Sequence, residues 1–278
     1  MRIGDVTVHP LSDGVVPMPP GLLYPDVPAS VWQDLPGTVD EQGLLQVPFG
    51  GFLAMDRRGN RVVFDLGGGL DPQLLPDGEL PPVRELLPLR LAELDCAPAS
   101  VTDVVLSHLH IDHVGWASTG GVPTFPGARH HIHTEDWKHY VDGDADDAVR
   151  RKVAPLRDAA LLWDGDSVSP FDWLRLVHAP GHTPGTSIAL IESRGESLAL
   201  VGDLFHHPAA LDHPHWRCGF DWDARQAEAA RRHWLERLRT TRTPLVGPHF
   251  PGLEPVTLHG DSGVSSENSV SKGLPWTA

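Results

Sequence analysis

The chain has 278 residues, enough for one large domain with a sizeable core or for two small domains. Its formal net charge of −15 disfavours binding to nucleic acid or to an anionic membrane surface, and no stretch has the length and apolarity of a membrane span. Two cysteines are too few for a disulfide framework, and the N-terminal residues lack the apolar core of a signal peptide, so we expect a cytoplasmic protein.

The first part of the chain predicts short strands around one long irregular segment. The expected strands cover residues 3–9, 14–17, 49–55 and 61–65, with a break at Ser12–Gly14. Residues 17–48 are rich in Pro and Gly and have no clear period. We interpret them as a surface loop, as a flap over a pocket or as the contact surface of a homodimer. Asp65 then begins a glycine-rich turn that allows close approach to a ligand.

The most informative stretch follows the next expected strand, residues 103–106. It contains three imidazoles and a carboxylate within six residues: His108, His110, Asp112 and His113. Imidazole nitrogen and carboxylate oxygen are the usual protein ligands of zinc and similar metals. Because a loop directly after a buried strand holds its side chains on a rigid scaffold, this stretch predicts a metal site.

Three later strand ends carry further candidates. His182 follows an expected strand at residues 173–178, Asp203 follows one at 197–201, and His249 follows one at 244–247. Each of these residues alone is a weak signal. Helices are expected over residues 83–96, from about 134, over 146–161 and over 223–239.

Taken together in this order, these residues resemble the metallo-β-lactamase superfamily. The resemblance runs from the turn at Asp65 to His249 and implies an αβ/βα sandwich, in which two mixed sheets face each other with helices outside. We expect one domain of this fold over residues 1–260, with a flexible tail over 261–278. The active site is then expected along one edge of the sandwich.

The resemblance also implies two divalent metal ions, most simply zinc, with Mn, Fe, Co and Ni as alternatives. Carried over position by position, the ligands of one ion are His108, His110 and His182, and those of the other are Asp112, His113 and His249. Asp203 is expected to bridge both ions, and Asp65 to hold a ligand histidine from behind. Seven ligands are too many for one tetrahedral zinc, which independently favours two ions.

The activity implied is hydrolysis of a small-molecule substrate. A metal-bridging hydroxide would attack a small ester, lactone or phosphotriester, and Asp112 would carry the proton to the leaving group. The same fold could instead serve a biosynthetic thioesterase or cyclase, or an iron-dependent oxygenase. A non-catalytic binding protein is a further alternative.

The substrate class is narrowed by the loops around Asp203 and His249. The chain resembles the branch that holds lactonase-type and methyl parathion hydrolase-like members, and residues 202–208 and 248–252 look most like the latter type. Lactonases typically place Tyr three residues after the bridging Asp, where this chain has His206, which counts against a quorum-signal lactonase. Candidates for the pocket wall, with ordinary core packing as the alternative, are Phe205, His206, His207, Trp216, Phe220 and Trp222.

Overall fold

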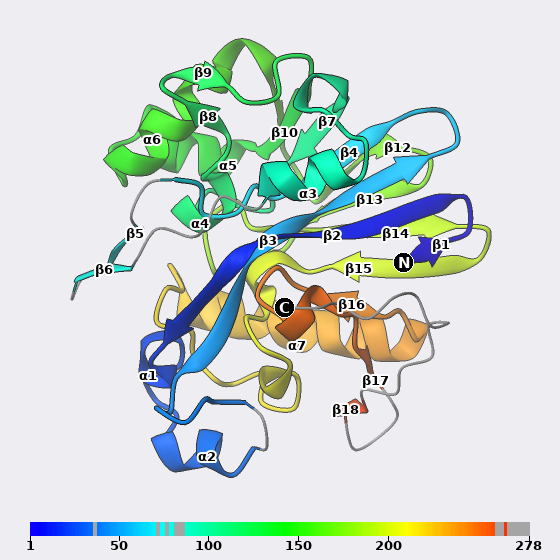
Figure 1. Ribbon diagram of the computed structural model, residues 1–278. Coiled ribbons are helices and arrows are strands. Elements are labelled where there is room, and N and C mark those ends of the chain that lie inside the picture. Colours follow the sequence, from blue (N-terminus) through cyan, green and yellow to red (C-terminus); the bar gives the residue numbers. More distant parts are fainter. Residues whose placement is uncertain (36–37, 71–72, 76–77, 81–86, 259–263, 266–278) are drawn as a thin grey trace.

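Two β-sheets face each other in the computed structural model, and helices cover the outer face of each sheet (Figure 1). The structure describes residues 1–35, 38–70, 73–75, 78–80, 87–258 and 264–265. In the described part of the chain, one sheet has the strand order β1-β2-β3-β4-β7-β10-β11 and the other has the order β12-β13-β14-β15-β16. Helices α3 to α6 lie on one side of the sandwich and α7 on the other (Figure 1).

The strands have the following bounds. The first sheet contains β1 (Arg2–Ile3), β2 (Val6–Met18), β3 (Leu45–Asp56), β4 (Arg61–Phe64), β7 (Asp103–Val105), β10 (Arg129–His133) and β11 (Ala160–Trp163). The second contains β12 (Ser167–Phe171), β13 (Leu174–His178), β14 (Ser187–Ser193), β15 (Glu196–Leu200) and β16 (Leu245–Val246). Short antiparallel pairs are β5 (Gln73–Leu75) with β6 (Gly78–Leu80), β8 (Ser118–Thr119) with β9 (Val122–Pro123), and β17 (Thr257–Leu258) with β18 (Val264–Ser265).

The helices are mostly short. They are α1 (Pro20–Leu23), α2 (Ala29–Gln33), α3 (Leu87–Glu93), α4 (Ile111–Val114), α5 (Thr134–Asp136), α6 (Asp147–Val153) and α7 (Ala224–Thr241). A π-helical turn, Trp137–Asp142, continues α5. The predicted helix at 223–239 is confirmed as α7, whose N-terminal amides of Arg225 and Gln226 donate to the side chain of Asp223.

Alternation along the strands of the first sheet divides the apolar residues between two cores. Val62 and Phe64 point into the core between the sheets, whereas Val63 between them points into a second core beneath α3 to α6. The core between the sheets extends to Leu235 and Leu238 of α7. The result is the four-layer αβ/βα sandwich that the resemblance implied.

Two local predictions differ from the structure. The expected break at Ser12–Gly14 is wrong, because β2 continues through a bulge there and turns the side chain of Asp13 inward. Asp13 accepts hydrogen bonds from the Gly69 amide and the Trp116 indole. The helix expected over 146–161 ends at Val153, because Pro155 has no amide hydrogen, and the chain continues as a 3₁₀ helix into β11.

Two other predicted segments are only partly described. Residues 83–86 of the helix expected over 83–96 lie outside the described residues, and so does nearly all of the tail expected over 261–278. Within residues 17–48, positions 36–37 are also outside them. The described part of that segment carries α1 and α2, and its Tyr24 and Trp32 are buried in the hydrophobic cluster that continues from the core between the sheets.

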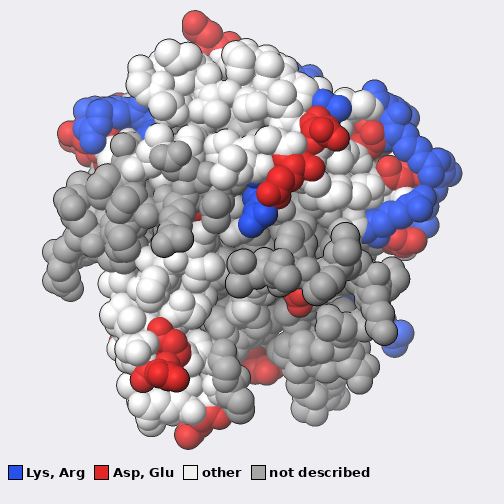
Figure 2. Space-filling model, in the orientation of Figure 1, with Lys and Arg blue, Asp and Glu red and all other residues white. Residues whose placement is uncertain are grey.

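Charged side chains of both signs are mixed on the face shown in Figure 2, where a run of basic side chains follows the right edge beside acidic ones. Arg57 and Arg194, for example, both pair with Asp5. Within the ranges described above, no helix combines the length and apolarity needed to cross a membrane.

Gly115, two residues after His113, offers a test of how closely the glycine-rich turn packs. A Cβ atom on Gly115 would lie 2.1 Å from the carbonyl carbon of Gly68 and 2.3 Å from its oxygen. Gly115→Ala is therefore expected to lower the free energy of unfolding by about 1–3 kcal/mol or more. Gly127→Ala, whose Cβ would meet Ala99 O at 3.7 Å, is the control and should unfold like the wild type in urea titrations. Equal stability of the two variants would contradict the close approach.

Candidate metal centre

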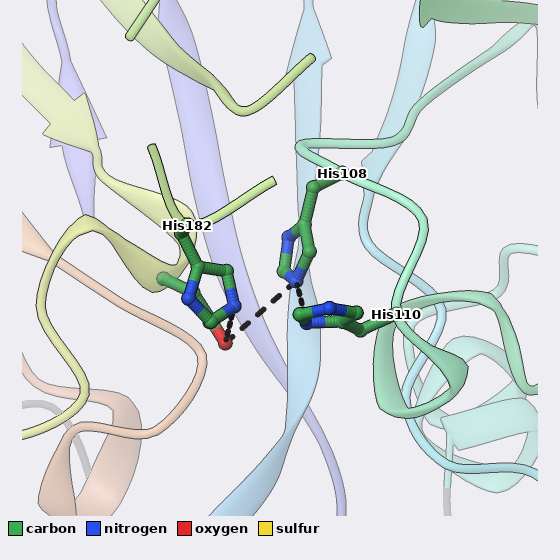
Figure 3. Close-up of side chains that lie close together, drawn as sticks. His108, His110 and His182 are labelled. Atoms are coloured by element: carbon green, nitrogen blue, oxygen red, sulfur yellow. Dashed lines mark hydrogen bonds and ion pairs between the residues drawn. The ribbon is translucent and has the colours of Figure 1, made fainter. Parts of the chain in front are cut away.

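Four loops at one edge of the sandwich bring the sequence-predicted ligands together. His108 and His110 follow β7, and Asp112 and His113 lie on the short helix α4. His182 follows β13, Asp203 follows β15, and His249 follows β16. Figure 3 shows the imidazoles of His108 and His110, from one loop, and of His182, from another, turned toward one another. The structure groups the seven residues into two sets that share Asp203.

The first set consists of His108, His110, His182 and Asp203, whose ligand atoms all lie within 4.8 Å of one another. His108 Nε2 lies 3.1 Å from His110 Nδ1 and 3.7 Å from Asp203 Oδ2. His182 Nε2 lies 3.3 Å from the same carboxylate oxygen. Ligand bonds of 2.0–2.3 Å around a tetrahedral ion place the ligand atoms about 3.3–3.8 Å apart. The first set is close to that spacing.

The second set consists of Asp112, His113, His249 and Asp203. The Nε2 atoms of His113 and His249 are 3.3 Å apart, and they lie 3.8 and 3.4 Å from Asp112 Oδ2. Asp203 Oδ1 is 3.1 Å from the first of these nitrogens and 3.3 Å from the second. The two oxygens of Asp203 therefore face different sets, which is the arrangement that a bridging carboxylate requires.

The hydrogen bonds behind the rings show that these sets suit cations. His113 Nδ1 lies 3.0 Å from Asp65 Oδ2, and His249 Nδ1 lies 2.7 Å from Pro48 O. Because such oxygens accept hydrogen bonds, each ring holds a proton on Nδ1, and its inward Nε2 is the atom left to bind an ion. A divalent ion between the two Nε2 atoms would displace any proton there and bind both.

Two further atoms at the centre need a partner. His182 Nε2 and Asp203 Oδ1 are buried and have no hydrogen-bond partner among the described residues. The other nitrogen of His182, Nδ1, lies 3.1 Å from Asp221 Oδ1. Buried polar atoms are rarely left unsatisfied in folded proteins. The donor set, its spacing and these unsatisfied atoms all fit two divalent metal ions.

The electrostatics of the centre favour the same occupants. Burial, with the neighbouring histidines, lowers the pKa of His110 to about 3, so its lone pair is free at neutral pH. Burial also opposes a charge on His249, but Asp203 and Asp112 outweigh it and raise the pKa to about 9. The buried carboxylates of Asp203 and Asp112 are thus stabilised by positive charge beside them, which protons or metal ions can supply.

A buried carboxylate that the sequence analysis missed supports the ligand loops. Asp136 Oδ2 accepts from the amide of Leu109, between two ligand histidines, and from the hydroxyl of Thr183. Its Oδ1 accepts from the Gly185 amide at 2.6 Å. Burial raises the pKa of Asp136 to about 6, against the effect of these hydrogen bonds. In the sequence, Asp136 looked like an acidic residue at a helix N-terminus, so only the helix was predicted.

Asp221 is a second missed support. One of its oxygens faces His182, and the other accepts from the guanidinium of Arg231 at 3.1 Å. Arg231 lies on α7 and is buried. Helix α7 therefore holds His182 in place through Asp221, although the two are far apart in the sequence.

The candidate pocket residues occupy different environments. Phe205 and Trp216 are buried in the hydrophobic cluster that continues from the core between the sheets. His206 is buried and lies 2.9 Å from Asp203 Oδ2. His207 caps a short 3₁₀ helix, and Phe220 is half-buried. Trp222 is largely exposed, and its amide donates to His182 O.

Comparison with known proteins identifies the family. The family model described as the metallo-β-lactamase superfamily matches residues 52–262, so the chain belongs to that superfamily. A search of curated proteins found no match.

Solved structures share the fold at low sequence identity. A probable metal-dependent hydrolase from Staphylococcus aureus is 20% identical, with a TM-score of 0.85, over 99% of this chain and 100% of that one. AidC, a dizinc quorum-quenching lactonase, is 19% identical, with a TM-score of 0.83, over 98% and 97% of the two chains. The hydrolase AbOPH is 22% identical, with a TM-score of 0.81, over 95% and 94%.

Replacing Asp136 tests whether its carboxylate supports the ligand loops. Asp136→Asn replaces an oxygen by an amide that donates, so at least one buried donor loses its partner. We expect a loss of about 1–3 kcal/mol in unfolding free energy and metal binding weaker by about 10- to 100-fold. Urea unfolding and competition with a chelator measure the two effects. Asp172→Asn, whose side chain is 84% exposed, is the control, and unchanged metal affinity in Asp136→Asn would contradict the support role.

Proposed function

We propose that this protein is a dinuclear metal-dependent hydrolase acting on a small neutral or apolar ester, lactone or phosphotriester. The observation that carries the proposal is the pair of donor sets that meet at Asp203, one on each carboxylate oxygen. One set supplies three histidines, and the other supplies two histidines and Asp112. Two bound divalent ions would lower the pKa of water at the site and polarise a carbonyl or phosphoryl oxygen.

The ligand histidines act by holding lone pairs at fixed positions. Asp65, Asp221 and Pro48 O face the outer nitrogens of three of them and fix their ring orientation. Such contacts orient the imidazole and increase its basicity. The substrate then meets a preorganised site, which needs little rearrangement during reaction.

We assign to Asp112 the transfer of a proton to the leaving group. Its side chain is 22% exposed, whereas those of Asp203, His113 and His249 are 3% exposed or less. Burial alone would raise the pKa of Asp112, but His113 and His249 outweigh it and hold the pKa below the usual range. An ionised carboxylate at the accessible side of the site can take up a proton and deliver it to the leaving group.

The similar structures support hydrolysis without identifying the substrate. AidC is described as a dizinc lactonase with a bound product, and AbOPH as a hydrolase. His206 stands at the position where lactonases typically have Tyr, and it is buried against Asp203. We therefore include simple lactones, aryl esters and phosphotriesters, rather than quorum signals alone, in the proposed substrate range.

Metal removal tests the class of reaction. The metal-free protein should be inactive and should unfold at a lower temperature, because a ligand at a thousand times its Kd adds about 4 kcal/mol of stability. Adding back Zn, Mn, Co, Fe or Ni should restore hydrolysis of at least one member of a panel of lactones, aryl esters and phosphotriesters. Thioesters and oxygen consumption with iron belong in the same panel. Fewer than two metal equivalents in active protein would contradict the dinuclear site.

Replacing Asp112 separates proton transfer from folding. Asp112→Asn should lower kcat by about 100- to 10,000-fold while its melting temperature stays close to that of the wild type. The metal content must be measured, because Asp112 also belongs to the second donor set, and rates are compared at saturating metal. Asp158→Asn, an exposed position, is the control. Undiminished turnover by Asp112→Asn would remove it from the mechanism.

A further inference from the structure

We propose that the chain contains an additional binding position for a thiophilic metal ion, formed by Cys218, His206 and His182 beside Asp203. The ligand atoms of Cys218, His206 and His182 all lie within 4.8 Å of one another. Cys218 and His206 lie in the loop between β15 and α7, and His182 lies in the loop after β13. This proposal concerns metal binding and does not rest on the proposed hydrolysis.

The spacing of these atoms suits one tetrahedral ion. Cys218 Sγ lies 3.6 Å from His206 Nε2, and His182 Nε2 lies 3.3 Å from Asp203 Oδ2. Both distances fall within the spacing of about 3.3–3.8 Å between ligands of such an ion. His206 Nε2 and Asp203 Oδ2 are closer, at 2.9 Å. An ion would replace the proton shared by that pair, and a shift of a few tenths of an ångström would complete the position.

The three side chains are buried, and one of them lacks a partner. Cys218 and His182 are each 2% exposed, and His206 is 5% exposed. Asp221 occupies Nδ1 of His182, so the lone pair at Nε2 points into the position without a hydrogen-bond partner among the described residues. The sulfur accepts a hydrogen bond from the amide of Phe220, which suits a thiolate.

The same surrounding groups support the thiol and the imidazole. Asp221 faces His182 with one oxygen and accepts from the Cys218 amide with the other. Arg231 holds that second oxygen from α7. The Gly219 amide donates to Leu23 O, so the segment carrying α1 also fixes the loop beside the cysteine. Groups that orient metal ligands in this way are a usual part of built metal sites.

The additional position competes with the first donor set. Both use His182 and lie beside Asp203 Oδ2, and one lone pair of His182 cannot bind two ions. Thiolate favours Zn²⁺, Cd²⁺ and Cu⁺, whereas sets of nitrogen and oxygen donors suit harder ions such as Mn²⁺. A thiophilic ion beside Cys218 would therefore leave His108 and His110 without their third histidine.

The chain provides a matched control for the sulfur ligand. Its only other cysteine, Cys96, is also buried, but it lies in the core beneath α3 to α6, beside Ser100. Cys96→Ser and Cys218→Ser thus make the same chemical change in two buried environments. They separate sulfur coordination from a general effect of losing a thiol.

Cadmium titration of the full-length, metal-free protein is the test. The wild type and Cys96→Ser should show a thiolate-to-cadmium charge-transfer band that saturates at one equivalent. Cys218→Ser should show no band, and His206→Asn should bind the band-forming ion about 10- to 100-fold more weakly. X-ray absorption with one equivalent of zinc should show one sulfur neighbour at about 2.3 Å in the wild type. Mn²⁺ in excess should reduce the band by taking His182.

Several results would overturn the proposal. They are a wild type without the band and without a sulfur neighbour, a band that survives in Cys218→Ser, and unchanged affinity in His206→Asn. Circular dichroism checks the folding of each variant. If Cys218→Ser fails to fold, His206→Asn decides the question, because it keeps Cys218 and removes one proposed nitrogen ligand. Hydrolysis could fail on every substrate without affecting these results.

Discussion

The metal centre depends on buried carboxylates that accept hydrogen bonds from the loops carrying the ligands. Asp136 joins the loop of His108 and His110 to the loop of His182, and Asp65 and Asp221 fix individual imidazoles. Without these acceptors, several buried donors would lose their partners, at a cost of about 1–3 kcal/mol each. The protein therefore concentrates negative charge around the centre, and that charge favours cations at the point where the loops converge.

The sandwich gives these acceptors a rigid frame. Strands β4, β7 and β10 are parallel neighbours in one sheet, and β15 and β16 are parallel in the other. Loops after these strands reach the same edge, as is usual for sites at the carboxyl ends of parallel strands. The Gly68–Gly69 backbone lies against Gly115, so the glycine-rich turn supports α4 and its ligands. Packing thus limits how far any ligand can move.

The ligand motif could be predicted from the sequence because four of its members lie within residues 108–113. The sandwich followed from the family resemblance, and apolar alternation located most strands. The supports could not be predicted in the same way. Asp136 is 27 residues from the amide that it holds, and Asp221 is 39 residues from His182. The sequence next to a single acidic residue does not indicate whether its side chain is a buried hydrogen-bond acceptor or caps a helix. The bulge at Asp13 was missed for the same reason, because its partners are distant in the sequence.

The loop between β15 and α7 connects the candidate centre to the segment that carries α1 and α2. It carries His206 against the shared carboxylate and Cys218 against His206. Trp216 of the same loop packs against Tyr24 and Trp32, with ring centroids 5.6 and 5.2 Å apart, so residues 17–48 anchor it. A substitution in α1 or α2 would therefore alter the packing of the loop that holds Asp203 through these aromatic contacts, without changing a ligand residue. Because Asp203 faces both donor sets, the packing of that segment would bear on the affinity of each set for a metal ion.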